Sequence, residues 1–252
     1  MVDYITYKDT IIFSPSYNES INLDLLQAYN KIIFSNHELT DDLFIKYSND
    51  NFCNLEYVYS KFNQPVVLPE NIIHLTFGFD FNQPVVLPEN IIHLTFGFDF
   101  NQPIILPENL THITFDFCFN RPVELPENIT HLTFGMCFDQ PVVLPENITH
   151  LTFGNDFNQP IELPQNITHL IFNEHFNQKI NLPFGIKYLK LENDKSHNLD
   201  YLPEGIEVLE LGEYFNSPMN NLPNSLLVIK LYKRYKGSLK CIHHNTKIEY
   251  IQ

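Results

Sequence analysis

Alanine, tryptophan and cysteine are scarce in this chain of 252 residues. Ala28 is the single alanine, tryptophan is absent, and the four cysteines are Cys53, Cys118, Cys137 and Cys241. Helical proteins favour alanine, so its near absence points away from a helical bundle and toward strands and turns. Four cysteines are too few for a disulfide scaffold in a chain of this length.

Basic residues are few, and long apolar runs are absent. The chain has 15 Lys and Arg residues against 30 Asp and Glu residues, which gives a net charge of −15. This charge would repel nucleic acid and anionic membranes, so neither is an expected partner. The first residues, MVDYITYKDT, do not resemble a signal peptide, and no segment approaches the about 18 apolar residues of a membrane span. We therefore expect a soluble intracellular protein with neither feature.

What the sequence does contain is a tandem repeat. Residues 62–80 read FNQPVVLPENIIHLTFGFD, and residues 81–99 repeat this segment without a change. A Leu-Pro pair then marks the frame at intervals of 19 and finally 20 residues; its leucines are Leu68, Leu87, Leu106, Leu125, Leu144, Leu163, Leu182, Leu202 and Leu222. A fixed period of this length is typical of stacked repeats and not of an ordinary globular core.

Each repeat is predicted to form one coil with a short strand and an extended return. In residues 128–134, Ile129, Leu132 and Phe134 follow the spacing LxxLxL, and His131 points to the opposite side of the strand. Prolines flank this segment and exclude a helix running through the repeat. Successive strands must be parallel, because every coil turns the same way. The expected fold is mainly β: a solenoid with one curved parallel sheet and proline-containing return segments.

Two neighbouring positions after the return-path proline are predicted to face opposite ways. The first is always apolar and is expected to face inward; it holds Val66, Val85, Ile104, Val123, Val142, Ile161 and Ile180. The second includes Glu and Asn and is expected to face water; it holds Val67, Val86, Ile105, Glu124, Val143, Glu162 and Asn181. One coil has too few core side chains to offset the entropy of ordering its backbone, so stability must come from faces shared between coils.

The repeat pattern weakens toward both ends of the chain. The predicted organisation is an N-terminal cap with degenerate repeats at 1–61, repeats of 19–20 residues at 62–235, and a C-terminal cap at 236–252. Within the first cap, the sequence predicts apolar segments at Tyr29–Ser35 and Leu55–Tyr59 and a short helix near Asp41–Tyr47. Caps of this kind cover the open apolar faces of terminal coils.

The residues of the repeat are similar to those of a known protein family. Phe-Asn-Gln-Pro-Val/Ile followed by Leu-Pro-x-x-Ile-x-x-Leu-x-Phe-Gly resembles the FNIP repeat, known mainly from social amoebae and from giant viruses that infect amoebae. The resemblance covers roughly residues 62–235. It implies a right-handed, leucine-rich-repeat-like solenoid, a role in protein–protein contact and, for a viral protein, a place in the host cytoplasm. Many members carry an F-box, which residues 1–60 do not display, so one alternative is a ubiquitin-ligase substrate adaptor lacking a recognisable F-box.

Histidines form one candidate surface. Parallel strands would place them about 4.8 Å apart on the exposed sheet face; they are His74, His93, His112, His131, His150 and His169. The simplest interpretation is a solvated row. The alternative is a pH- or metal-responsive solenoid, in which adjacent imidazoles lower one another's pKa. Stacked rings converge poorly on one ion, so no metal site and no cofactor is predicted.

A second row consists of metal-ligand residue types just before the repeat Phe. It contains Asp80, Asp99, Cys118, Cys137, Asp156, His175 and Asp194. The spacing of 19 residues differs from that of zinc motifs and predicts a line instead of a cage. Metal binding is not expected there.

The strongest candidate for partner binding is the loop after each strand. It holds Phe79, Phe98, Phe117 and Met136, whereas later coils hold Asn155 and Glu174 at the same position. A core position would not accept Asn and Glu, so these four side chains are expected at the surface, with burial against the N-terminal cap as the alternative. On the C-terminal strands the residues of the concave face differ from coil to coil, and Tyr188 on this face is a further candidate for partner binding.

No catalytic motif is recognisable. A Ser-His-Asp arrangement, a Gly-rich phosphate loop and an HExxH sequence are all missing, so catalytic residues are not predicted. The predicted function is a non-catalytic scaffold that binds an unidentified protein through the concave sheet or the strand-following loop edge.

Overall fold

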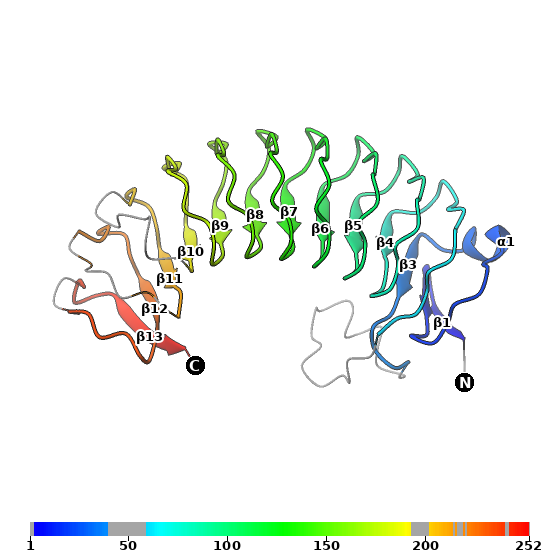
Figure 1. The fold of residues 1–252 in the computed structure, drawn as a ribbon, viewed down its shortest axis with the longest axis horizontal. Helices are drawn as coiled ribbons and strands as arrows, with labels where there is room; N and C mark the ends of the chain where they lie inside the picture. The colour runs from blue at the N-terminus through cyan, green and yellow to red at the C-terminus, as the bar shows by residue number, and fades with distance from the viewer. Residues whose placement is uncertain are drawn as a thin grey trace. The chain divides into compact units, whose positions relative to one another are not determined.

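A computed structural model describes residues 3–39, 59–192, 202–213, 215, 219, 221–239 and 242–251. The chain divides into two compact units, Met1–Asn128 and Ile129–Gln252, which are described separately below. Both units consist mainly of short strands joined by connections that, apart from one short helix in the first unit, lack regular secondary structure (Figure 1). In the part of the chain that is described, no helix is long and apolar enough to cross a membrane.

The first unit holds six neighbouring strands. They are β1 (Tyr4–Tyr7), β2 (Thr10–Phe13), β3 (Lys31–Phe34), β4 (His74–Thr76), β5 (His93–Phe96) and β6 (His112–Phe115). From β2 onward each strand pairs in parallel with the next, as predicted for successive coils. The register pairs equivalent residues, so that His74 lies beside His93 and Leu75 beside Leu94.

The second unit continues the same arrangement with seven strands. They are β7 (His131–Phe134), β8 (His150–Phe153), β9 (His169–Phe172), β10 (Tyr188–Leu191), β11 (Val208–Leu211), β12 (Val228–Tyr232) and β13 (Lys247–Ile251). All pair in parallel with their sequence neighbours within this unit. The strand order therefore follows the repeat order.

Alternation along each strand sorts side chains between core and open face. In β5, Leu94 and Phe96 are buried, whereas His93 and Thr95 are half-buried on the other face. Phe100, at the start of the following repeat, is also buried and stacks on Phe96 with 3.7 Å between ring centroids. Two columns of phenylalanine thus fill the interior of each unit, with equivalent rings 5.5–6.2 Å apart in the first.

The return segments largely follow the predicted orientation. All seven residues of the second position are exposed, as predicted. The seven of the first position are half-buried, so they face inward less completely than their apolar character suggested. Asparagine side chains link the return segments of neighbouring coils by hydrogen bonds. Oδ1 of Asn82 accepts the backbone N–H of Asn101 at 3.0 Å, and Oδ1 of Asn63 accepts the backbone N–H of Asn82 at 3.0 Å. These bonds satisfy backbone donors that lack a sheet partner.

The N-terminal cap shows features that the repeat did not predict. β1 and β2 form an antiparallel hairpin, the one departure from parallel pairing among the described strands. A short helix, α1 (Leu23–Leu26), begins after Asn22, whose side chain accepts the N–H of Asp24 at 2.9 Å. The helix predicted near Asp41–Tyr47 lies outside the described residues. The segment Tyr29–Ser35 contains β3.

Candidate functional site

The six histidines open the strands β4 to β9 and stack in a row within each unit. Ring centroids lie 4.5 Å apart for His74 and His93 and 4.1 Å apart for His93 and His112. In the second unit, His150 lies 4.1 Å from both His131 and His169. The rings approach closer than the about 4.8 Å between strands, as tilted and stacked imidazoles can.

The threonine before each later histidine fixes the orientation of the ring. The Thr149 hydroxyl donates to the carbonyl of Thr130 at 3.1 Å, and its oxygen lies 2.9 Å from Nδ1 of His150. A hydroxyl has one proton, so this arrangement assigns the proton of the second bond to Nδ1. Thr111 with His112, and Thr168 with His169, repeat the pattern. The neutral rings thereby keep Nε2 as their acceptor.

Burial and crowding disfavour charge on this row. Desolvation, followed by the neighbouring His131 and His169, lowers the pKa of His150 from 6.5 to about 4. Desolvation also lowers the pKa of His74, with Lys31 adding to the effect. The direction is the one that closely spaced imidazoles predict.

Phe79, Phe98 and Phe117 stack side by side at the turn after their strands; they are called the aromatic row below. Adjacent centroids lie 4.4 Å and 4.2 Å apart, with interplanar angles of 12°. Tyr59 of the N-terminal cap packs on Phe79 at 4.2 Å. All three phenylalanines are half-buried, so they are neither core residues nor fully solvated.

Met136 occupies the equivalent turn of the second unit and is 38% exposed. In the next coils of that unit, Asn155 is half-buried and Glu174 is exposed. The position therefore lies at the surface, as predicted, and the fold accepts polar side chains there. Among the described residues, Tyr59 of the cap packs on Phe79, in line with the alternative of burial against the cap for that residue.

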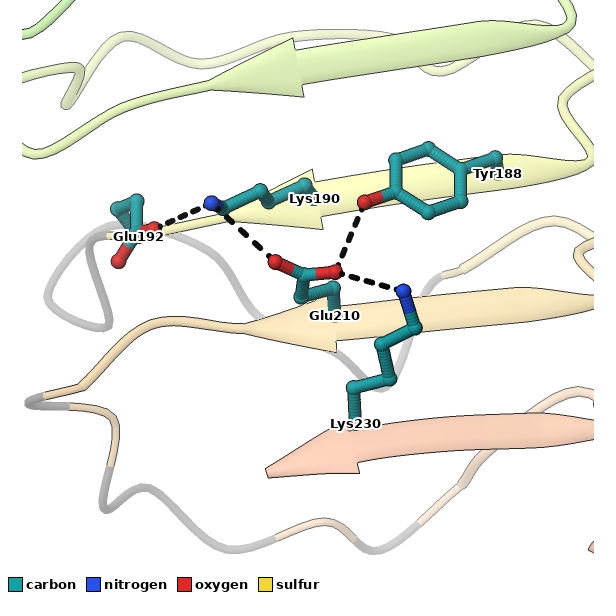
Figure 2. Close-up of polar contacts among 5 residues, drawn as sticks. All are labelled: Tyr188, Lys190, Glu192, Glu210 and Lys230. Carbon is teal, nitrogen blue, oxygen red and sulfur yellow. Dashed lines mark hydrogen bonds and ion pairs between the residues drawn. The ribbon is translucent and has the colours of Figure 1, made fainter. Parts of the chain in front are cut away.

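A network of charged groups covers the C-terminal strands. Lys190 and Lys230 flank the carboxylate of Glu210, with Nζ–O distances of 3.2 Å and 3.1 Å. The Tyr188 hydroxyl donates to the same carboxylate at 2.9 Å, and Lys190 also pairs with Glu192 at 2.8 Å (Figure 2). The register of β10, β11 and β12 brings these residues together across three strands.

These contacts fix the charge states of the network. Burial works against ionisation of Glu210, yet the bonds from Tyr188, Lys230 and Lys190 outweigh it and lower the carboxyl pKa. Burial and the Glu210 bond raise the pKa of Tyr188. Burial opposes the charge on Lys190, but Glu192 and Glu210 raise its pKa overall. Two cations and two carboxylates, Lys190 and Lys230 with Glu192 and Glu210, leave the network neutral.

Comparison with known protein families identifies the repeated segments. The sequence profile of the FNIP Repeat matches residues 62–99, 83–118, 119–156, 138–163, 157–194 and 195–236. The chain belongs to the FNIP repeat family. None of the curated proteins compared with it matches.

A solved structure supports the same fold for this FNIP chain. CroV588, a giant-virus protein described as a novel circular LRR protein, is 37% identical and aligns with a TM-score of 0.65. The match covers 74% of this chain and 32% of CroV588, so the chain spans about a third of that protein. The predicted mainly β, leucine-rich-repeat-like fold class is thereby confirmed.

The candidate residues fall into distinct rows of the FNIP coils. Tyr188 extends the histidine row, because its ring lies 5.9 Å from that of His169. In the Asp/Cys/His row, His175 Nδ1 lies 3.4 Å from Asp156 Oδ1, and Cys118 and Cys137 are half-buried. Across the described residues, no group of three or more His, Cys, Asp and Glu side chains is arranged to hold a metal ion.

Two features went unrecognised in the sequence. Lys190, Glu210, Lys230 and Glu249 occupy the same strand position and alternate in charge; this 20- or 19-residue alternation was the available signal. The repeated Thr-His pair was likewise a signal for the hydrogen bonds that orient the imidazoles. The charge network and the Thr-His hydrogen bonds both depend on which residues lie side by side in neighbouring coils. The repeat spacing predicts this register only if the strands are assumed to pair in parallel.

Proposed function

We propose that this FNIP chain is a non-catalytic scaffold that binds a protein partner, with the aromatic row as its anchor. One observation carries the proposal: three phenylalanines stack at a surface turn where other coils have Asn155 and Glu174. Because the fold accepts polar residues at this turn, its stability does not explain the aromatic side chains. Aligned, half-exposed rings suit the aromatic or aliphatic anchors of a partner.

The test separates binding from stability. The variant Phe98→Ser is compared with Phe96→Ser, whose ring belongs to the buried column. Phe98→Ser should keep a cooperative unfolding transition yet lose partners captured by cross-linking in amoebal lysate, whereas Phe96→Ser should unfold. A replacement in the second unit, Asn155→Ser, is the control that should keep both. Retained capture by the triple variant of Phe79, Phe98 and Phe117 to Ser would count against the proposal.

A pH-responsive role is a second candidate, because the stacked imidazoles resist protonation. The low pKa of His150 means that the folded row gains charge only near pH 4, so a change in partner binding is expected only at such acidity. Partner capture compared at pH 7.5 and at about pH 3.5, below the pKa of His150, tests this role. Equal capture at both values by wild type and by a His150→Asn variant would remove the histidine row from the function.

A further inference from the structure

The return segments of the first unit expose a second apolar surface. Val67, Val86 and Ile105 lie in consecutive coils; they are called the return ridge below. Val86 is 88% exposed and Ile105 is 90% exposed. The prolines two residues before them, Pro65, Pro84 and Pro103, are exposed as well. Six apolar side chains thus form an uncharged strip facing solvent.

The fold does not require this strip to be apolar. The same coil position is Glu124 at the end of the first unit, and Glu162 and Asn181 in the second, all three exposed. Polar side chains therefore suit this place in the coil. An uninterrupted apolar run in three consecutive coils points to contact with another molecule.

A row of carboxylates runs beside the return ridge. Glu70, Glu89 and Glu108 follow the ridge residues by three positions, which is at most about 10 Å of chain, and all are exposed. The turns that carry them are held in place, since Asn90 donates to the carbonyl of Glu70 at 2.8 Å and Asn109 to that of Glu89 at 2.9 Å.

The remaining borders of this surface are a polar row and a hollow. On the other side of the ridge, the side-chain oxygen of Asn63 accepts the backbone N–H of Asn82 and the side-chain amide of Gln83, and these groups carry no charge. A hollow lies at the Glu70 end, lined by Leu23, Gln27, Leu68, Pro69, Glu70 and Asn71. The surface is therefore apolar in the middle and acidic along one flank. The other flank is uncharged at Asn63, Asn82 and Gln83 and ends at Arg121, whose Nε donates to the carbonyl of Asn101 at 3.1 Å.

We propose that the return ridge binds a basic amphipathic helix lying along the direction of coil stacking. Apolar side chains one turn apart would contact Val67, Val86 and Ile105, and Lys or Arg on one flank would face the glutamates. A helix repeats about every 5.4 Å, and equivalent phenylalanine rings of these coils lie 5.5–6.2 Å apart, so the two periods differ by less than about 2 Å over two intervals. The chain's net charge of −15 favours a cationic partner.

This inference goes beyond the proposed function, because it uses none of the aromatic-row residues. The probe is a fluorescein-labelled, Ala-rich helical peptide of about 15 residues with leucines one turn apart and lysines on one flank. Fluorescence anisotropy with the full chain should give saturable binding that weakens as salt increases. A peptide with glutamates in place of the lysines should bind at least about tenfold more weakly.

Variants can be taken from other coils of the same chain. Val67→Asn, Val86→Asn and Ile105→Asn together copy Asn181 and test the apolar strip. Glu70→Gln, Glu89→Gln and Glu108→Gln together copy Gln165 and test the acidic flank. Each triple variant should lower affinity at least about tenfold, whereas Val143→Asn and Phe98→Ser should leave it unchanged. Unchanged melting temperatures would confirm that all variants fold.

Four results would overturn the proposal. The first three are absence of saturable binding, binding that survives both triple variants, and a wild-type dimer that the Asn triple variant converts to monomer in sedimentation equilibrium. The third result would assign the ridge to a second copy of this chain. The fourth is loss of binding in Phe98→Ser, which would move the peptide to the aromatic row and leave the proposed function standing without the ridge.

Discussion

Glu210 is the residue on which the polar network of the C-terminal strands converges. Its side chain is 13% exposed and accepts bonds from two ammonium groups and one phenol. A carboxylate with this number of donors stays ionised despite partial burial. The cations in turn depend on it, since removing one partner of a partly buried ion pair leaves the other without compensation.

Glu210→Gln should therefore lower the free energy of unfolding by about 1–3 kcal/mol at neutral pH. The amide keeps the shape but removes the charge that faces Lys190 and Lys230. The matched control is Glu207→Gln, which breaks the more exposed 2.9 Å pair with Lys187 and should cost less than about 1 kcal/mol. Urea unfolding measures both. Equal losses for the two variants would show that the network adds nothing to an ordinary surface pair.

His150 makes stability depend on pH. Its pKa in the folded chain is lowered to about 4, below the ordinary 6.5. The unfolded chain then binds the proton more readily, so the contribution of His150 to stability falls as pH decreases from about 6.5 to about 4 and is constant below that range. His150→Asn should lose less stability than wild type between pH 7.5 and about pH 4.5 in urea titrations. Parallel pH profiles for the two proteins would contradict this.

At the scale of a strand and its turn, close coil contact makes glycine necessary at particular positions. A Cβ placed on Gly97 would overlap the carbonyl oxygen of Gly78 in the preceding coil. The strand β5 and the turn after it could then not approach β4 as they do. Gly97 does not have a positive φ, so the reason for a glycine at this position is the close approach and not the backbone conformation.

Gly97→Ala should cost at least about 2 kcal/mol, because backbone atoms must move to relieve the overlap. Gly185→Ala is the control: its Cβ would lie 3.4 Å from the carbonyl oxygen of Gln165, an ordinary contact. That variant should be neutral or slightly stabilising, by at most about 1 kcal/mol. Thermal unfolding of both compares them directly, and a tolerated Gly97→Ala would mean that the coils can separate.

Elements that repeat could be predicted from the sequence, and elements that do not repeat could not. The alternation of Leu94 and Phe96 with His93 predicts β5 and its register, because one misaligned residue would turn the core side outward. The antiparallel β1–β2 hairpin and α1 have no repeated counterpart that reveals their orientation. Contacts such as the Tyr59–Phe79 pair join the cap to the repeats, and no pattern in the sequence encodes them.

The candidate surfaces likewise divide into features that the repeat predicts and features that it does not. Residues that recur at 19-residue spacing, such as the histidines, are placed by the repeat alone. The aromatic row was predicted at the surface, but its ring stacking depends on side-chain orientation. The Glu210 network needs both register and side-chain reach across three strands, so the sequence shows its charges without its bonds.

At the scale of the molecule, nearly every described stabilising contact joins a coil to its immediate neighbour. Strand pairing, phenylalanine stacking and the asparagine bonds all recur at intervals of about one coil. Stability in such an array is the sum of coil terms and nearest-neighbour interfaces. A coil can then be removed without harm if the new neighbours match.

The identical segments 62–80 and 81–99 allow this to be tested without creating a new interface. Deleting residues 81–99 joins Asp80 to Phe100 in the same local sequence as the natural Asp99–Phe100 junction. The shortened chain should fold, keep its circular dichroism per residue and unfold at a lower denaturant concentration, since one coil and one interface are lost. A deletion of residues 81–90 alone, which breaks the frame, is the control and should unfold the first unit. If the in-frame deletion were as damaging as the control, stability would have to reside in contacts that extend beyond neighbouring coils, and the nearest-neighbour account of this solenoid would be wrong.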